Sequence, residues 1–158
     1  MINIGIADLN TTKCPGVLAT YALGSCIGIC LYDAELKIAG LAHIMLPWSK
    51  DAGAGADNNM RRYADTGITE LIQKMCAMGA KKYRLTAKIA GGAQMFSTNS
   101  TVFNIGERNV EAVKKVLATY NIPIIAEETG SNYGRTVFFY SEDGIMEVRA
   151  ATKPTKRL

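Results

Sequence analysis

The sequence has little histidine: His43 is the only one among 158 residues. Any chemistry that needs an imidazole therefore has one possible position. Cysteine is also scarce, and the four cysteines form no CxxC pair and no spacing typical of a zinc ribbon. We therefore expect no metal site.

Long hydrophobic runs are missing too. No stretch reaches the roughly 18 uncharged apolar residues that a membrane span requires. Residues 1–6 carry no basic segment and no long apolar core, and Asp8 follows soon after, which is unlike a signal peptide. We therefore expect a cytoplasmic protein without direct membrane insertion, in which thiols stay reduced.

Charge of one sign is not in large excess. There are 18 basic and 14 acidic residues, giving a net charge of +4. This small and scattered surplus does not favour nucleic-acid binding. The densest basic stretch contains Lys153, Lys156 and Arg157. We interpret it as a solvated end of the chain, with contact to an acidic protein partner as the alternative.

The residues that are present fit one domain, 1–158, with a single core, since about half of them are apolar. Helical spacing of apolar residues predicts helices over 61–78 and 108–120. Short apolar or β-branched segments predict strands at 2–7, 16–21, 26–32, 36–46, 83–90, 122–127, 135–140 and 145–150. Consecutive hairpins favour an α+β fold over a doubly wound parallel sheet. We expect a layered sandwich of mixed, mainly antiparallel β-sheet with two main helices packed on one side.

The segment 26–46 predicts a β-hairpin with a polar turn at 33–35. Pairing Cys26 directly with His43 centres the hairpin on that turn and puts both side chains on one face, about 5 Å apart. The imidazole then lies where it can take the thiol proton. The alternative is that both residues are structural, because a strand cysteine is commonly a small buried hydrophobe and a lone histidine is commonly a core residue. A register shift of one residue also separates the pair.

Two neighbouring features bear on this pair. Gly24 and Ser25 form a small-residue turn before Cys26, and its backbone amides are candidates for an oxyanion hole. A small and polar loop, 49–59, follows the histidine strand where a lid could close. A redox sensor would need a resolving cysteine, and Cys30 is about 13 Å away along the strand, too far for a disulfide.

Longer segments resemble a known family. The stretch 20–26 (Thr-Tyr-Ala-Leu-Gly-Ser-Cys) followed by 42–47 (Ala-His-Ile-Met-Leu-Pro) resembles the signature of the CheD chemoreceptor glutamine deamidases. Segments 88–96, 105–109 and 129–135 resemble further family segments in the same order. Two positions depart from the pattern: Ser131 stands where the family has a glycine, and Glu128 stands where it usually has an aspartate.

The resemblance implies a role for each matching residue. Cys26 is the expected nucleophile, and His43 is the expected general base and then general acid. Thr20 is expected to orient the imidazole, although a β-branched residue is ordinary in a strand. Gly24 and Ser25 are expected to shape the substrate pocket. Phe103 is a candidate anchor for a protein partner, with a core position as the alternative.

The resemblance also implies a substrate and partners. The expected reaction converts glutamine side chains of methyl-accepting chemotaxis receptors to glutamate through a thioester, without cofactor, as part of chemotaxis adaptation. A CheC-type phosphatase, which acts on the response regulator, is an expected partner. The rival function is an adaptor that mainly regulates this phosphatase by binding. A cysteine hydrolase acting on some other amide is a third possibility.

Overall fold

The protein is described by a computed structural model that covers residues 1–53, 58–95 and 104–158. These residues contain ten strands and two α-helices. The helices are α1 (Ala64–Ala77) and α2 (Ile105–Thr119). The strands are β1 (Ile2–Ile4), β2 (Asp8–Lys13), β3 (Val17–Leu23), β4 (Ile27–Asp33), β5 (Ile38–Ile44), β6 (Thr86–Gly91), β7 (Ile124–Thr129), β8 (Arg135–Tyr140), β9 (Met146–Ala150) and β10 (Lys153–Arg157).

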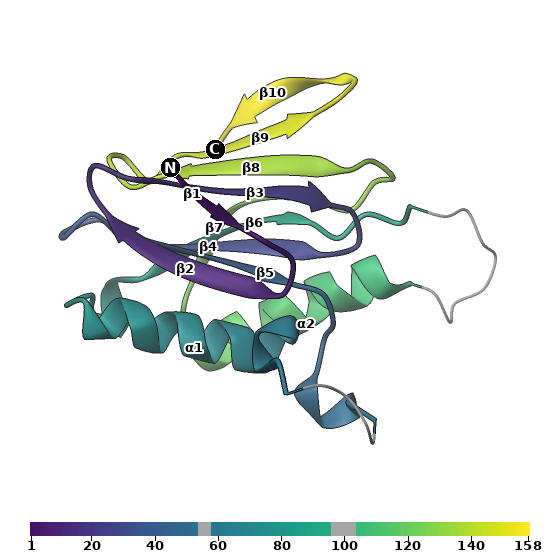
Figure 1. Ribbon diagram of the computed structural model, residues 1–158, viewed down its shortest axis with the longest axis horizontal. Coiled ribbons are helices and arrows are strands. Elements are labelled where there is room, and N and C mark those ends of the chain that lie inside the picture. The colour runs from purple at the N-terminus through teal and green to yellow at the C-terminus, as the bar shows by residue number, and fades with distance from the viewer. Residues whose placement is uncertain (54–57, 96–103) are drawn as a thin grey trace.

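The strands form two five-stranded sheets that stack on one another (Figure 1). The outer sheet has the order β1-β3-β8-β9-β10, and the central sheet has the order β2-β5-β4-β6-β7. Only the β1/β3 and β6/β7 pairs are parallel among the strand pairs of the described residues. Both helices cover the face of the central sheet that is turned away from the outer sheet (Figure 1). The predicted α+β sandwich with two helices on one side is therefore confirmed.

Strand β4 separates two buried layers. Ile27, Ile29 and Leu31 belong to the core between the central sheet and the helices. Cys30 and Tyr32 belong to the core between the two sheets. Alternate residues of a strand point to opposite faces, so a strand that is covered on both faces is apolar along most of its length, and in β4 only the last residue, Asp33, is charged. This explains why all seven residues of β4 are buried and why its sequence shows no polar alternation.

Two strands were not predicted from the sequence. Strand β2 reads Asp-Leu-Asn-Thr-Thr-Lys, which is mostly polar because it lies at the edge of the central sheet beside β5. Strand β10 contains the basic residues that we interpreted as a solvated end. They are exposed, but they pair with β9 and extend the outer sheet. The predicted exposure of these residues is confirmed, but the sequence did not indicate that they form a strand.

Helix α2 begins three residues before the predicted start. Its first turn packs directly on the backbone that follows β6, because a β-carbon on Gly106 would lie 2.4 Å from the carbonyl oxygen of Ala93. Only glycine allows this approach. The start of α2 is therefore joined to the chain segment 91–93, which borders the candidate site described next. Among the described residues, no helix is both long and apolar enough to cross a membrane.

Candidate active site

A hydrogen-bonded chain joins Thr20, His43 and the backbone across the two sheets. The Thr20 hydroxyl of β3 donates to the carbonyl oxygen of Ile4 at 2.7 Å. The hydroxyl oxygen of Thr20 also lies 2.7 Å from Nδ1 of His43 on β5. A hydroxyl has one hydrogen, and Ile4 receives it, so Nδ1 must carry a proton and donate to Thr20. The tautomer inferred in this way leaves a lone pair on Nε2.

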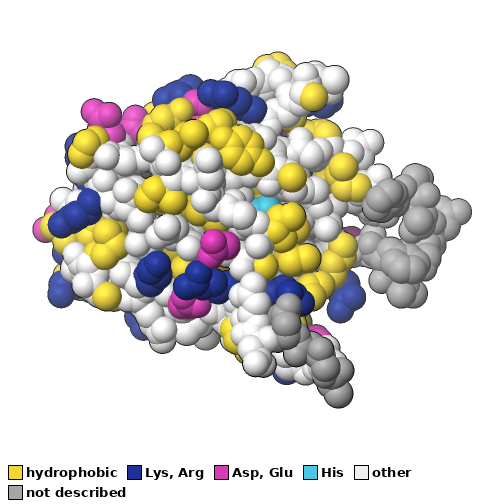
Figure 2. All heavy atoms as spheres, viewed as in Figure 1, with side chains coloured by type: hydrophobic (Ala, Val, Ile, Leu, Met, Phe, Trp, Pro, Cys, Tyr) yellow, Lys and Arg dark blue, Asp and Glu magenta, His cyan; other side chains and the backbone are white. Residues whose placement is uncertain are grey.

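His43 is buried at the base of this chain. Its side chain is 0% exposed, and Figure 2 shows only a small cyan area among white and yellow atoms. Within the described part of the chain, His43 Nε2 has no hydrogen-bond partner. The imidazole is therefore fixed on one side and unengaged on the other.

The predicted pairing of Cys26 with His43 was wrong by two residues. Gly28 is the residue opposite His43, and the hairpin turn centres between Glu35 and Leu36. A shift of two residues preserves the face. Cys26 therefore has the same facing as Gly28 and packs against the layer between the sheets, where His43 also lies. The two residues are diagonal neighbours, a relation in which positions lie about 7–8 Å apart and side chains can approach one another.

Gly28 leaves space at the centre of this arrangement. A β-carbon at this position would lie 3.2 Å from Leu23 Cδ1 and 3.7 Å from Thr20 Cγ2. These atoms belong to β3 of the outer sheet. The absence of a side chain opposite His43 therefore lets Thr20 reach the imidazole.

Burial favours the neutral form of both Cys26 and His43. It raises the pKa of the Cys26 thiol, although the residue's own backbone N–H acts in the opposite direction. It lowers the pKa of His43 to about 4. At neutral pH the resting site therefore holds a thiol and a neutral imidazole, rather than a thiolate beside an imidazolium.

The turn that carries Cys26 is held by its carbonyl groups. Ala93 N–H donates to Gly24 O at 2.8 Å, and Gly92 N–H donates to Cys26 O at 2.9 Å. The N–H groups of Ser25 and Cys26 donate to no carbonyl among the described residues. These two amides are therefore the candidates for an oxyanion hole.

Asn109 holds the same turn from the helix side. Its Nδ2 donates to Ser25 O and to Met45 O, both at 2.9 Å. These two carbonyls lie just before β4 and just after β5, the strands that bring Cys26 and His43 together. Sequence reasoning assigned Asn109 no role. The available signal was a polar residue in the apolar stripe of α2, close to Val113 and Val116.

The remaining predicted positions divide into two groups. Ser131 adopts a φ of 59°, a left-handed conformation that favours the glycine of the family pattern. Phe103 lies outside the described residues, as do residues 54–57 of the loop that we considered a lid. The described start of that loop is fixed, because Ser49 donates twice to Asp65.

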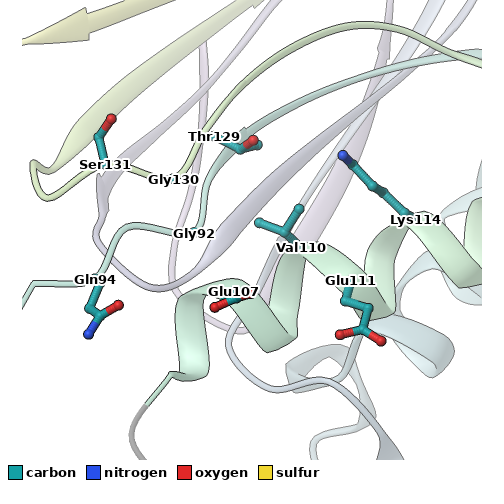
Figure 3. A pocket seen from close by; sticks show the side chains of 9 residues that line it. All are labelled: Gly92, Gln94, Glu107, Val110, Glu111, Lys114, Thr129, Gly130 and Ser131. Carbon is teal, nitrogen blue, oxygen red and sulfur yellow. The ribbon is translucent and has the colours of Figure 1, made fainter. Parts of the chain in front are cut away.

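A cavity of about 500 Å³ lies beside the turn 24–26, between α2 and the ends of β6 and β7 (Figure 3). Gly92 joins it to the turn through its bond to Cys26. Carboxylates of Glu107 and Glu111 line one wall, and Lys114, which pairs with Glu127, lies further along the helix. The described residues contain no group of three metal-ligating side chains of the His, Cys, Asp or Glu type.

Comparison with known proteins gives consistent matches. The family model described as CheD chemotactic sensory transduction matches residues 45–150, a span that begins after His43. A probable chemoreceptor glutamine deamidase CheD of Caldanaerobacter subterraneus subsp. tengcongensis is 55% identical over 152 residues, covering 94% of this chain and 92% of that protein. The chemoreceptor glutamine deamidase CheD of Halalkalibacterium halodurans is 46% identical over 160 residues, covering 100% and 98%.

Proposed function

The chain belongs to the CheD family of chemoreceptor glutamine deamidases, and from this premise we propose that it hydrolyses glutamine side chains of chemotaxis receptors with Cys26 as nucleophile. His43 is the base, and Thr20 orients it. The observation that carries the proposal is the Thr20–His43 hydrogen bond, which leaves the lone pair of Nε2 available on the face shared with Cys26.

The first step forms a thioester. As Cys26 Sγ attacks the carboxamide carbon of the substrate, its proton passes to His43 Nε2. The oxyanion that forms is stabilised by the free N–H groups of Ser25 and Cys26. His43 then returns the proton to the amide nitrogen, the carbon–nitrogen bond breaks, and ammonia leaves.

The second step releases glutamate. A water molecule gives a proton to His43 Nε2 and attacks the thioester carbon. The carbon–sulfur bond breaks, and the proton returns to the sulfur of Cys26. Because the resting pair is neutral, proton transfer and attack are coupled and await a bound substrate. Gly24 and Ser25 leave room for that substrate beside the thiol.

Exposed apolar side chains around the turn support a protein as the substrate. Tyr21 is 44% exposed and Met95 is 47% exposed. Met95 packs against Gly24, where a β-carbon would lie 3.2 Å from its Cγ. Apolar side chains of this kind, placed around a reactive group, suit docking of a helical receptor segment rather than free glutamine.

The same surface also suits a protein partner, and we propose that a CheC-type phosphatase binds this protein in the cytoplasm. Deamidation and binding together link the protein to chemotaxis adaptation. The alternative function is regulation of that phosphatase by binding alone. An intact Cys26, His43 and Thr20 arrangement favours retained catalysis, because a pure adaptor has no need of an oriented imidazole.

The test is incubation of the full chain with a purified cytoplasmic receptor fragment, with glutamine-to-glutamate conversion followed by peptide mass spectrometry. We expect conversion by the wild type and none by Cys26→Ala or His43→Ala. Cys76→Ser, which changes an exposed cysteine on α1, is the matched control and should remain active. Activity retained by Cys26→Ala overturns the proposal. A folded but inactive wild type favours the binding function, and phosphatase affinity is then the next measurement.

A further inference from the structure

A buried ion pair lies beside the nucleophile turn. Arg135, the first residue of β8, has a side chain that is 0% exposed. Its Nε donates to a carboxylate oxygen of Glu128 at the end of β7. Glu128 also accepts from the Tyr133 hydroxyl at 2.9 Å and from Lys156 Nζ at 3.2 Å. Two further donors, Tyr133 before β8 and Lys156 on β10, therefore hold the carboxylate that binds Arg135.

These donors keep Glu128 ionised. Burial alone would raise the pKa of its carboxyl group, but the hydrogen bonds from Arg135, Tyr133 and Lys156 outweigh burial and hold the pKa below its usual range. The Arg135 guanidinium also lies 4.4 Å from the centre of the Tyr133 ring, an arrangement that favours a cation. Both charges of the pair are thus maintained in the protein.

Arg135 contacts the segments on both sides of Cys26. Its backbone pairs with Leu23, three residues before the nucleophile. Its Nη1 donates a long hydrogen bond of 3.4 Å to Gly91 O. Gly91 lies opposite Ile27, and the next residue, Gly92, donates to Cys26 O. One side chain therefore links the strand that leads into the turn to the strand that supports it.

Strand order places Arg135 on the opposite flank of Cys26 from His43. In the central sheet β4 lies between β5, which carries His43, and β6, whose Gly91 meets Arg135. On β8 the residues Arg135, Val137 and Phe139 alternate onto the buried face. Val137 pairs with Thr20, whereas Arg135 pairs with Leu23. Arg135 therefore lies nearer to Cys26 along the strands than Val137 does.

The Arg135–Glu128 ion pair is energetically unfavourable if its only role is to stabilise the fold. Among the described residues, Arg135 Nη2 has no hydrogen-bond partner although it is buried. An unpartnered buried donor is unfavourable, and apolar side chains often replace a buried ion pair without loss of stability. The presence of a guanidinium here therefore points to a requirement of the site rather than of the core.

We propose that Arg135, held by Glu128, is a positioning residue that fixes both strand ends around Cys26 and so keeps the thiol aligned with His43. The proposal rests on the proposed function of the Cys26–His43 pair. Arg135 transfers no proton and touches no substrate. Its effect passes through the backbone at Leu23 and Gly91.

The variants are chosen so that a buried charge is never left alone. The double variant Arg135→Met with Glu128→Gln removes both charges at similar volume. Arg135→Lys keeps the charge but loses the planar fork that reaches two acceptors. Arg149→Met on β9 is the matched control, because Arg149 packs over Phe138 and pairs with Glu147 rather than with Glu128 or Gly91.

We expect the double variant to fold and to lose about 100-fold in kcat on the receptor fragment, with KM changed by less than about threefold, because a misplacement of about 1 Å costs this much. Arg135→Lys should show a smaller loss of about tenfold in kcat, and Arg149→Met should match the wild type. Melting curves establish that each variant is folded. A folded double variant with wild-type kcat overturns the proposal.

Alkylation of Cys26 by iodoacetamide, measured across pH without substrate, separates this proposal from the deamidase function. The positioning role predicts that the double variant and Arg135→Lys shift the pH profile of alkylation, with a rate change of about fivefold at a given pH, whereas Arg149→Met does not. If the wild type shows no deamidation but the profile shifts, the deamidase function fails and the positioning role stands. An unchanged profile in folded variants overturns the positioning role.

Discussion

The two ends of β4 both carry buried polar side chains, and they differ in how completely these side chains are hydrogen bonded. At the far end, Asp33 accepts from three backbone N–H groups and from the guanidinium of Arg84. At the end that begins beside Cys26, His43 Nε2, Arg135 Nη2 and Asn109 Oδ1 have no partners among the described residues. Buried polar groups that serve only stability are normally paired. The unpaired donors and acceptors at this end therefore support the proposed site there.

Ionisation differs between the two ends in the same way. Burial alone would raise the pKa of Asp33, but the hydrogen bonds from Arg84 and the backbone outweigh it and hold the pKa below its usual range. At the other end burial is the largest influence, and it lowers the pKa of His43 and raises the pKa of Cys26. Asp33 is therefore ionised and fully hydrogen bonded, whereas Cys26 and His43 are neutral at neutral pH.

The largest effect on this contrast is expected from His43→Gln. The amide can still donate to Thr20 but cannot take the thiol proton, so kcat should fall by about 10³-fold or more at pH 7. The free energy of unfolding should change by less than about 1 kcal/mol, because the buried contact is kept. Receptor deamidation and urea unfolding measure the two quantities. A kcat within tenfold of the wild type would contradict the assigned role of His43.

Asp33→Ala is expected to lower stability and to leave activity unchanged. Removing the carboxylate leaves several donors without an acceptor, so the protein should lose about 3 kcal/mol of stability. The specific activity of the folded fraction should not change, since Asp33 lies at the other end of β4. Glu35→Ala is the matched control, because Glu35 also pairs with Arg84 but is 67% exposed. Equal losses of stability in Asp33→Ala and Glu35→Ala would show that the hydrogen bonds to Asp33 do not stabilise the protein.

Lowering the pH should reduce stability through His43 first and through Asp33 only at lower pH. The pKa of His43 is about 4 in the folded chain and about 6.5 when unfolded, so only the unfolded chain is protonated between these values. Stability is therefore complete above about pH 6.5 and should fall by about 2 kcal/mol at pH 5 and about 3 kcal/mol at pH 4. The lowered pKa of Asp33 places its own loss of stability below about pH 4.

Urea unfolding of the wild type and His43→Gln at pH 7, 6 and 5 checks this window. Other groups affect both proteins equally, so the difference between the two curves isolates His43. We expect the variant to lose less stability than the wild type as the pH falls. Parallel curves would contradict the buried, neutral imidazole.

The smallest effect is expected at Thr20. Thr20→Val keeps the shape but leaves His43 Nδ1 and Ile4 O without their partner, which should lower kcat by about tenfold. Thr20→Ser keeps the hydroxyl and should stay within about threefold of the wild type. Steady-state deamidation measures both. A Val variant as active as the Ser variant would show that packing alone orients the imidazole.

The fold class could be predicted from the sequence, whereas the register of the central hairpin could not. Long apolar segments and consecutive turns indicated the hairpins of an α+β sandwich. The hairpin loop spans 34–37, and Lys37 adopts a φ of 52°, so turn geometry rather than the polar composition sets the register. The face was predicted correctly because the error in register was two residues, and a shift by an even number of residues preserves the face.

The contacts within the site depend on how the two sheets stack. No spacing along the chain indicates that Thr20 of one sheet meets His43 of the other, and only the family resemblance suggested it. Arg135 left a readable signal, because alternation puts it on the same face of its strand as Val137 and Phe139. Its partner Glu128 comes from the other sheet and could not be found in this way.

Strand β10 has a consequence for how the protein behaves among its own copies. It forms a free edge of the outer sheet, where an incoming strand could extend the ladder. Its exposed residues Lys153, Lys156 and Arg157 repel an identical edge, and Pro154 has no N–H to offer. The pairing with β9 is also irregular between Lys153 and Lys156. The basic strand therefore protects the sandwich against edge-to-edge aggregation when the protein is crowded.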